Sequence, residues 1–179
     1  MAIIHIYGAS GSGTSTLARA IKNKYDYTHL DTDDYFWLPT NPPFVQKRPV
    51  EERLELLRRD IKKAGKVVIS GSLCGWGDAI ISLFDLVVRL GVPKELRIER
   101  LKRREYERFG ERVCIGGDMY EEHLKFIQWA GEYDDGDIFM RSKAMHDEWA
   151  KRIPCKHIVL DGTLSSDQLI QEMDRVFPL

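Results

Sequence analysis

A chain of 179 residues is long enough for one well-cored domain and too short for two of ordinary size, so we expect a single domain over residues 1–179. Hydrophobic residues make up 43% and charged residues 31%, and the formal net charge of -1 gives no overall positive field that would favour nucleic acid as a partner. No stretch approaches the roughly 20 consecutive apolar residues of a membrane span, so no membrane partner is expected.

The N-terminal segment and the cysteines favour a cytoplasmic location. Residues 1–7 contain no basic segment and run directly into glycines, which is typical of a first strand and not of a signal peptide. Cys74, Cys114 and Cys155 are odd in number, far apart and outside any C-x-x-C pair. That pattern argues against a disulfide framework or a zinc site and suits a reducing compartment.

Short apolar runs alternate with amphipathic segments along the chain. In chain order the pattern predicts a strand at 3–7, a helix at 15–24, a strand at 27–30, an irregular loop with four prolines at 33–49, a helix at 50–64, strands at 67–70 and 85–90, helices at 93–109, 118–133 and 137–152, a strand at 157–160 and a helix at 165–177. Strands that alternate with helices predict a three-layer α/β domain with a five-stranded parallel sheet and helices on both faces. Ligands of such sheets bind in the loops that follow the strands.

The first of these loops, residues 8–15, reads G-A-S-G-S-G-T-S between a predicted strand and a predicted helix. It matches the phosphate-binding pattern G-x-x-x-x-G-K-[ST] except that Thr14 replaces the lysine. Glycines allow the backbone amides to turn toward a phosphate, and the start of the following helix adds its own amides and dipole. The alternative is a turn of small residues that only caps the helix. We expect ATP to bind at Gly8, Ser10, Gly11, Ser12, Gly13, Thr14, Ser15 and Thr16.

Thr14 removes a charge that this kind of loop normally supplies. The lysine contacts the β- and γ-phosphates and follows the charge during transfer. The loss of one such electrostatic contact can lower a rate by about 10²–10³. Either another cation replaces the lysine, or the chain binds nucleotide without efficient phosphoryl transfer.

Three separated segments resemble the adenylate-kinase-like group of P-loop nucleoside monophosphate kinases. The first is the loop at 8–15. The second is residues 92–104, V-P-K-E-L-R-I-E-R-L-K-R-R, which is similar to the helix that enters the lid of that family. The resemblance implies that Arg100 lies against adenine and that Arg104 contacts phosphates. The third is residues 160–163, L-D-G-T, and it implies that the backbone at Gly162 and Thr163 passes the adenine ring.

The arginines of the second segment have a second interpretation. Arg100, Arg103, Arg104 and Arg108 alternate with glutamates, a pattern that is common on a solvated helix with weak i,i+4 pairs. The match to the lid entry favours Arg104, together with Arg100 or Arg108, as the charge that Thr14 lacks. Arg141 faintly resembles a further arginine that the family uses at the transferring phosphate.

The acceptor side departs from the adenylate kinase pattern. The loop at 70–77 lacks the arginine that the family places there, so AMP is not the expected acceptor. Asp31 and Asp33 form an Asp-x-Asp that resembles shikimate and gluconate kinases. This resemblance implies that Asp31 holds Mg²⁺ through water and that Asp33 binds an acceptor hydroxyl. The phosphate-binding pattern itself places the Ser15 hydroxyl as the other Mg²⁺ ligand. An acidic helix start or an Asx-turn is the alternative for both aspartates.

The aromatic residues on the acceptor side and the acidic segment near the lid each have two interpretations. The aromatic residues at 35–37 and Trp76 either stack on an acceptor or pack in the core. Residues 118–137 contain seven acidic residues and one lysine, which predicts a solvated acidic face of a lid. His123 and His146 lack the H-x-x-x-H or H-E-x-x-H spacing of a metal site, which favours the acidic face over a metal site here.

These patterns together predict an ATP-dependent kinase that acts on a nucleotide or a small hydroxylated metabolite, as a monomer or homodimer. The predicted catalytic residues are Asp33, Arg104 and Arg108, and the cofactors are ATP and Mg²⁺. Segments near 35–49 and 109–137, with a lid at about 105–137, are expected to close over the ligands and keep water out. The alternative is a nucleotide-binding sensor or switch with little or no kinase activity, whereas nucleic-acid binding has only local support from the arginines near the lid.

Overall fold

Strand β1 (Ala2–Gly8) lies at the centre of a five-stranded sheet in the computed structural model, which describes residues 2–179. The strand order is β2-β3-β1-β4-β5, and every neighbouring pair is parallel. The other strands are β2 (Thr28–Asp31), β3 (Lys66–Ser70), β4 (Leu86–Gly91) and β5 (Lys156–Asp161). The predicted parallel sheet is confirmed, and each strand ends within one residue of its predicted position.

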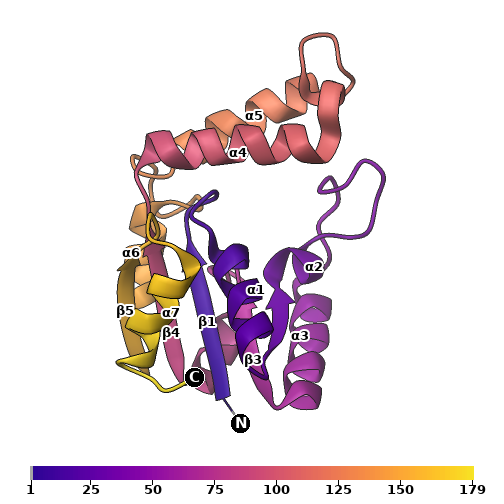
Figure 1. Ribbon diagram of the computed structural model, residues 1–179. Helices are drawn as coiled ribbons and strands as arrows, with labels where there is room; N and C mark the ends of the chain where they lie inside the picture. The colour runs from indigo at the N-terminus through magenta and orange to yellow at the C-terminus, as the bar shows by residue number, and fades with distance from the viewer. Residues whose placement is uncertain (1) are drawn as a thin grey trace.

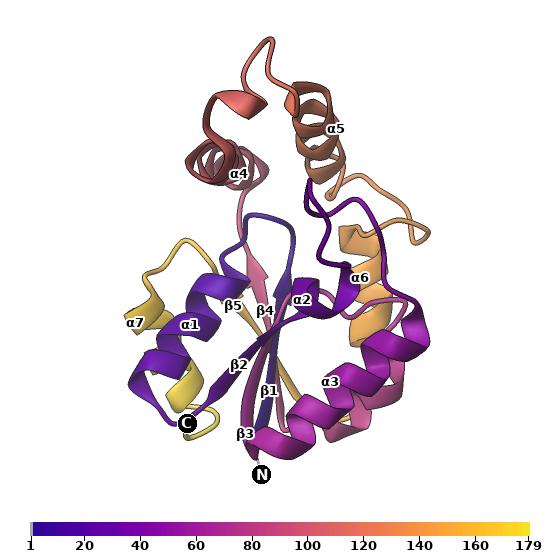
Figure 2. The ribbon, with the colours of Figure 1, turned by 90° about the vertical axis from the view of Figure 1, so that its right-hand side faces the viewer.

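Helices cover both faces of this sheet (Figure 2). One face carries α1 (Thr14–Lys24) and α7 (Ser166–Asp174), and the other carries α3 (Val50–Ala64) and α6 (Lys143–Ala150). The helices α4 (Lys94–Phe109) and α5 (Tyr120–Gly131) form a hairpin above the carboxyl ends of the strands (Figure 1). The remaining elements are α2 (Thr32–Phe36) and the 3₁₀ turns η1 (Asp78–Leu83) and η2 (Gly110–Val113).

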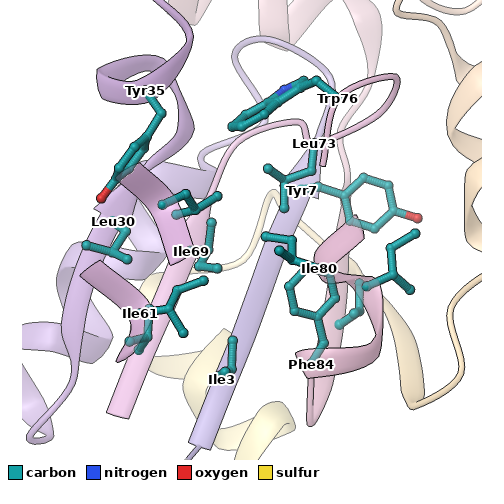
Figure 3. Close-up of a cluster of buried hydrophobic side chains, with 14 of the residues drawn as sticks. Ile3, Tyr7, Leu30, Tyr35, Ile61, Ile69, Leu73, Trp76, Ile80 and Phe84 are labelled. Atoms are coloured by element: carbon teal, nitrogen blue, oxygen red, sulfur yellow. The ribbon is translucent and has the colours of Figure 1, made fainter. Parts of the chain in front are cut away.

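Alternate side chains of the central strands enter two separate cores. In β1, Ile4 and Ile6 pack on the side of α1 and α7. Ile3 and Tyr7 pack on the opposite side (Figure 3), in the core that also contains Trp149 of α6. Each fully buried aliphatic side chain contributes about 1.5–3 kcal/mol to folding. Because both faces of β1 and β3 are packed in this way, the loops at the carboxyl ends of these strands rest on a rigid base.

Two predicted elements need correction. Residues 33–49 were expected to be irregular, but they begin inside α2, because the Asp31 carboxylate caps this helix and accepts a hydrogen bond from the Asp33 amide at 3.1 Å. The helix predicted at 137–152 is shorter and begins only at Lys143. Ser142 is its N-cap, and the Ser142 hydroxyl accepts from the Met145 amide at 3.0 Å. Residues 137–142 therefore form a connecting segment, and this segment carries Arg141.

The projecting hairpin is tied to the sheet at its base by Arg97. This side chain is 1% exposed, donates hydrogen bonds to the carbonyls of Val92 and Ala130, and forms an ion pair with Asp134. Asp134 remains exposed to solvent, as the acidic pattern predicts, and it also serves as the counter-ion of the buried Arg97 guanidinium. The hairpin also begins earlier than the predicted lid, since the whole of α4 runs above the sheet (Figure 1). No helix of residues 2–179 has the length and hydropathy needed to cross a membrane.

Candidate functional site

The loop between β1 and α1 has the backbone of an anion-binding turn. Gly13 precedes α1 with a φ of +94°, and no side chain caps the first turn of this helix. The first amides of the helix therefore have no side-chain partner, and the positive end of the helix dipole adds to them. Thr14 and Ser15 are half-buried, whereas Thr16 is exposed. A helix start of this kind can hold a phosphate group.

Close backbone contacts fix the same loop between α4 and the segment after β5. Gly11 has a φ of +82°, and a Cβ atom at this position would lie 2.6 Å from the carbonyl oxygen of Arg97. A Cβ atom on Gly162 would lie 3.0 Å from the carbonyl oxygen of Ser12 and 2.6 Å from Val92. Neither position has room for a side chain, so the glycines allow the three segments to touch.

The residues predicted beside adenine also come together. The Arg100 guanidinium donates a hydrogen bond to the carbonyl of Gly162 at 3.1 Å. The Thr163 amide donates to the Asp161 carboxylate at 2.9 Å, which forms an Asx-turn after β5. Arg100 and the loop at 160–163 therefore form one wall next to the phosphate loop, although they are about 60 residues apart in the sequence.

Ser15 and Asp31 are in direct contact at the ends of two different elements. The Ser15 hydroxyl donates to Asp31 Oδ2 at 2.6 Å, and the buried Ser70 hydroxyl donates to the same oxygen at 3.1 Å. Asp31 Oδ1 accepts from the Asp33 amide, so Asp31 caps α2 and faces Ser15 at the same time. His29 Nε2 lies 2.8 Å from the Ser70 hydroxyl and supports it from behind.

This set of hydroxyl and carboxylate oxygens fits Mg²⁺, which prefers hard oxygen ligands. Mg²⁺ is usually bound through one or two carboxylates together with substrate phosphates and water. Within residues 2–179 no three or more His, Cys, Asp or Glu side chains are grouped as metal ligands. The predicted pair Ser15 and Asp31 could hold Mg²⁺ together with phosphate oxygens and water.

Asp33 lies one step beyond this pair, at the start of α2. Its side chain is accessible to water, yet surrounding protein atoms and the neighbouring Asp31 raise the pKa of the Asp33 carboxyl above its ordinary value. Arg141 and Arg104 act in the opposite direction and favour the charged carboxylate. The structure thus brings together a carboxylate and two cations next to the phosphate loop.

Arg141 is the cation that contacts the phosphate loop directly. Its guanidinium donates a hydrogen bond to the Ser10 hydroxyl at 3.2 Å. Burial lowers the pKa of Arg141, and the nearby Asp33 carboxylate opposes that shift. Arg104, on α4, is more exposed and contacts the carboxylate of its neighbour Glu105 at 3.3 Å. Arg141, whose resemblance to the family pattern is weaker than that of Arg104, is therefore the arginine that contacts the phosphate loop.

Arg108 does not join this cluster. Its guanidinium lies 5.3 Å from the centre of the Phe44 ring, on the segment between α2 and α3. The reason is helix geometry, because four residues advance α4 by about 6 Å beyond Arg104 and past the phosphate loop. Arg103 points to solvent and pairs with Glu107 at 3.8 Å, as expected for a surface arginine.

The acceptor side contains a guanidinium that the sequence patterns did not indicate. Arg53 of α3 is 6% exposed, and its carbon Cζ lies 3.9 Å from the centre of the Phe36 ring. Its Nε donates to the carbonyl of Arg48 at 2.6 Å, and within residues 2–179 Arg53 forms no ion pair. Trp76 is also 6% exposed and belongs to the core, so the core alternative is correct for this residue. A buried cation without a carboxylate partner is a favourable site for an anion.

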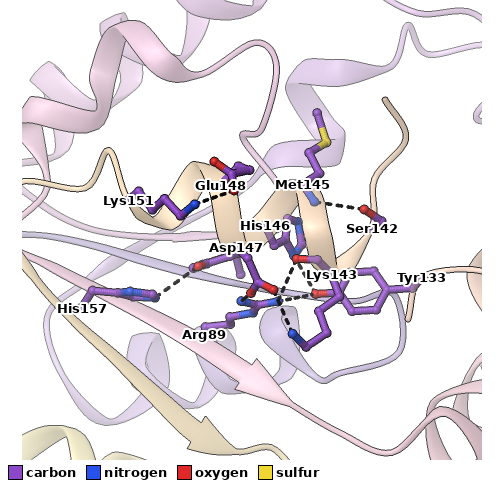
Figure 4. Close-up of polar contacts among 11 residues, drawn as sticks. Arg89, Tyr133, Ser142, Lys143, Met145, His146, Asp147, Glu148, Lys151 and His157 are labelled. Carbon is purple, nitrogen blue, oxygen red and sulfur yellow. Dashed lines mark hydrogen bonds and ion pairs between the residues drawn. The ribbon is translucent and has the colours of Figure 1, made fainter. Parts of the chain in front are cut away.

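The segment that carries Arg141 is held by the polar contacts between α6 and the sheet (Figure 4). The guanidinium of Arg89, on β4, donates to the Tyr133 hydroxyl at 3.0 Å. The ring nitrogens of His146 lie 2.8 Å from the Tyr133 hydroxyl and 3.2 Å from the Ser72 hydroxyl. Burial lowers the pKa of His146 to about 3, so this ring is neutral at pH 7 and has a structural role.

A family model described as an AAA domain matches residues 4–123. A protein of Bacillus subtilis (strain 168), named Uncharacterized protein YqaC, is 43% identical over 173 residues, which is 97% of this chain and 94% of that relative. The cytidylate kinase of Pyrococcus horikoshii is 32% identical over 114 residues. This match covers 58% of the present chain and 57% of the relative, so the chain spans little more than half of that enzyme.

Two solved structures share the arrangement of strands and helices. An unliganded sugar kinase from Janibacter sp. covers 99% of this chain and 96% of its own, with a TM-score of 0.53 and 18% identity. A shikimate kinase from Acinetobacter baumannii in complex with shikimate covers 98% of this chain and 92% of its own, with a TM-score of 0.57 and 14% identity. At these identities the likeness concerns the fold alone.

Proposed function

This chain belongs to the AAA domain family and has the fold of P-loop kinases of the nucleoside monophosphate kinase type, and we propose that it transfers the γ-phosphate of ATP to a small hydroxylated metabolite or a nucleotide. The kinase relatives and the kinase fold support a phosphotransferase, while ATP as donor and the class of acceptor are the proposed parts. The observation that carries the proposal is the position of Asp33 beside the phosphate loop, with Arg104 and Arg141 as its cationic neighbours.

The donor side is proposed to work as follows. The amides of residues 8–15 bind the phosphates of ATP, and Arg100 with the backbone at Gly162 flanks its base. Arg141 and Arg104 provide the positive charge that Thr14 does not supply. A loose transition state carries its charge on the phosphoryl oxygens, so fixed cations close to those oxygens lower the barrier.

Mg²⁺ would be held by Ser15 and Asp31 together with the phosphates. When bound, such an ion neutralises charge on the transferred group. The Ser70 hydroxyl donates to the Asp31 carboxylate at 3.1 Å and helps to keep it turned toward Ser15. His29 Nε2 lies 2.8 Å from the same hydroxyl and orients Ser70 in turn. Second-shell hydrogen bonds of this type orient metal ligands.

On the acceptor side Asp33 is proposed to orient the acceptor hydroxyl and to accept its proton. A carboxylate that accepts the proton of the attacking hydroxyl contributes typically about 10²–10⁴ in rate. The hairpin of α4 and α5 stands over this end of the sheet and is proposed to act as a lid that limits hydrolysis by excluding water (Figure 1).

The proposal is tested by calorimetric titration with ATP and a non-hydrolysable analogue, with and without Mg²⁺, followed by an ADP-release screen over nucleoside monophosphates, sugars and hydroxy acids. We expect micromolar binding that needs Mg²⁺ and ADP release that needs one class of acceptor. Tight binding without release for any acceptor would favour a sensor or switch, which Thr14 supports as the second candidate. The absence of nucleotide binding would contradict both functions.

Arg53 gives a prediction about the acceptor. Asp33 and Phe36 are three residues apart on α2, so they share one face, and the guanidinium stacked on Phe36 lies about one helical turn from Asp33. We expect Arg53→Met to raise the KM of an acceptor that carries a carboxylate or phosphate by about 10- to 100-fold, because a hydrogen bond to a charged group contributes about 1.5–3 kcal/mol.

The matched control for Arg53→Met is Arg59→Met on the same helix, an exposed arginine paired with Asp60 at 3.0 Å. The control is expected to leave KM unchanged, and neither variant should alter the affinity for ATP. Equal KM values for Arg53→Met and the wild-type protein, with an anionic acceptor, would contradict this role of Arg53. Thermal melting of both variants checks that the buried substitution has not unfolded the protein.

A further inference from the structure

Two aromatic side chains of α5, Phe126 and Trp129, form a continuous surface that carries both arginines of the proposed transfer. The rings are three residues apart on the helix, with centroids separated by 6.0 Å and planes inclined by 28°. The Cζ atom of Arg104 lies 5.9 Å from the centre of the Phe126 ring. The Cζ atom of Arg141 lies 4.7 Å from the centre of the Trp129 ring.

Arg104 and Arg141 each lie against an aromatic ring, whereas Arg97 at the base of the hairpin is held by an ion pair. Arg97 is neutralised by the carboxylate of Asp134. Arg141 forms no ion pair within the part of the chain that the structure describes, and Arg104 contacts only the carboxylate of the adjacent Glu105. An aromatic ring attracts a cation through its quadrupole and adds no negative charge. A guanidinium seated on a ring is therefore fixed in place while its charge stays available for a phosphate.

We propose that Trp129, together with Phe126, is a positioning residue that holds Arg141 and Arg104 at the phosphate loop, and that the rings do so without adding negative charge. The inference rests on the proposed function, because it assigns these cations to the phosphates of the donor. Its consequence is that the charge supplied by a loop lysine in related patterns is supplied here by Arg104 of α4 and by Arg141 of the segment 137–142. Thr14 leaves the loop neutral, and the aromatic rings of α5 hold these two arginines.

The direct test measures the affinity of the whole protein for inorganic tripolyphosphate by titration calorimetry, together with kcat in ADP release. Trp129→Leu is expected to weaken tripolyphosphate binding and to lower kcat by about 5- to 30-fold, the range of a partly desolvated cation–π contact. Trp129→Phe is expected to recover most of both values, because it restores an aromatic face. The KM of the acceptor should not change. Leu124→Ala, an exposed substitution on the same helix, is the matched control and should behave like the wild-type protein.

The outcomes separate this inference from the proposed function. If the wild-type protein bound neither ATP nor tripolyphosphate, the proposed function would fail. If the wild-type protein bound tripolyphosphate and Trp129→Leu bound it equally well, the positioning role would be overturned while the kinase proposal would stand. Trp129→Phe with the same loss as Trp129→Leu would also overturn it, since the ring would then not be the active feature. Phe126→Leu, which removes the ring next to Arg104 and the aromatic neighbour of Trp129, replaces Trp129→Leu if the latter does not fold, and an unchanged affinity for tripolyphosphate would then overturn the role of Phe126.

Discussion

Arg141→Met is expected to lower kcat by about 10²–10³, which is the usual effect of removing one pre-placed charge from the site of phosphoryl transfer. The guanidinium of Arg141 contacts Ser10 in the phosphate loop and has Asp33 as its electrostatic partner, so it is the cation proposed to take over the task of the lysine. Methionine keeps an apolar stem next to Trp129 and removes only the charge. The measurement is steady-state ADP release with the acceptor found in the screen, alongside calorimetric titration with ATP.

Two further variants make this prediction specific. Arg104→Met should reduce the rate or the affinity for ATP by far more than the roughly 0.5 kcal/mol of an ordinary surface change. Arg103→Met, on the same helix, removes a guanidinium that is 66% exposed and paired with Glu107, so it should have no such effect. If Arg141→Met or Arg104→Met behaved like Arg103→Met, the corresponding arginine would not be the compensating cation.

Thr14→Lys offers a test by rescue. The substitution returns the lysine of the phosphate-binding pattern to its place at the start of α1. We expect it to raise the activity of Arg141→Met at least about tenfold and to change the wild-type protein much less, because two groups that do the same task are not additive. A failure of the lysine to rescue Arg141→Met would mean that Arg141 acts in some way other than by replacing it.

The sheet could be predicted closely because its signal is local. Five short apolar runs are each bounded by glycine, proline or a charged segment, and a parallel sheet buried on both faces needs such runs. The same logic predicted that Ser15 and Asp31 would meet, since both follow strands whose carboxyl ends lie at one edge. The resemblance to the adenylate-kinase-like group implied that Arg100 and the backbone at Gly162 both flank adenine, and the two are in contact in the structure.

The parts that could not be predicted depend on which side chains meet across distant segments. The spacing of Arg141 from the preceding aspartates differs from the family pattern. Arg141 reaches the phosphate loop because α6 begins only after Ser142, which leaves Arg141 on a connecting segment. Residues 47–53 contain three basic residues, and Arg53 is the buried one. Nothing in the adjacent sequence distinguishes Arg53 from the other two. Trp76 is the opposite example, since it lies in a loop that follows a strand and yet belongs to the core. Its position depends on contacts with buried residues of several elements, which the local sequence does not show.

Asp33→Asn is expected to lower kcat by about 10²–10⁴ and to leave the affinity for ATP unchanged or slightly increased. An amide can orient the acceptor hydroxyl but cannot take its proton. The same substitution removes a negative charge close to the place where the phosphates bind, which explains the expected direction of the change in ATP affinity. The effect on kcat without a loss of donor binding is the property that distinguishes an acceptor-side base from a residue that binds nucleotide.

Asp34→Asn is the natural control, because Asp34 follows directly in α2 and its electrostatic neighbours are Asp31 and His29, not the two arginines. We expect this variant to keep nearly full activity. A loss of the same size for Asp33→Asn and Asp34→Asn would show that the start of α2 tolerates no change of charge, and the role of Asp33 as base would be lost. If Asp33→Asn instead weakened ATP binding and left kcat unaltered, Asp33 would belong to the donor side. The acceptor would then have to be sought next to Arg53 of α3, which packs on Phe36 one turn further along α2.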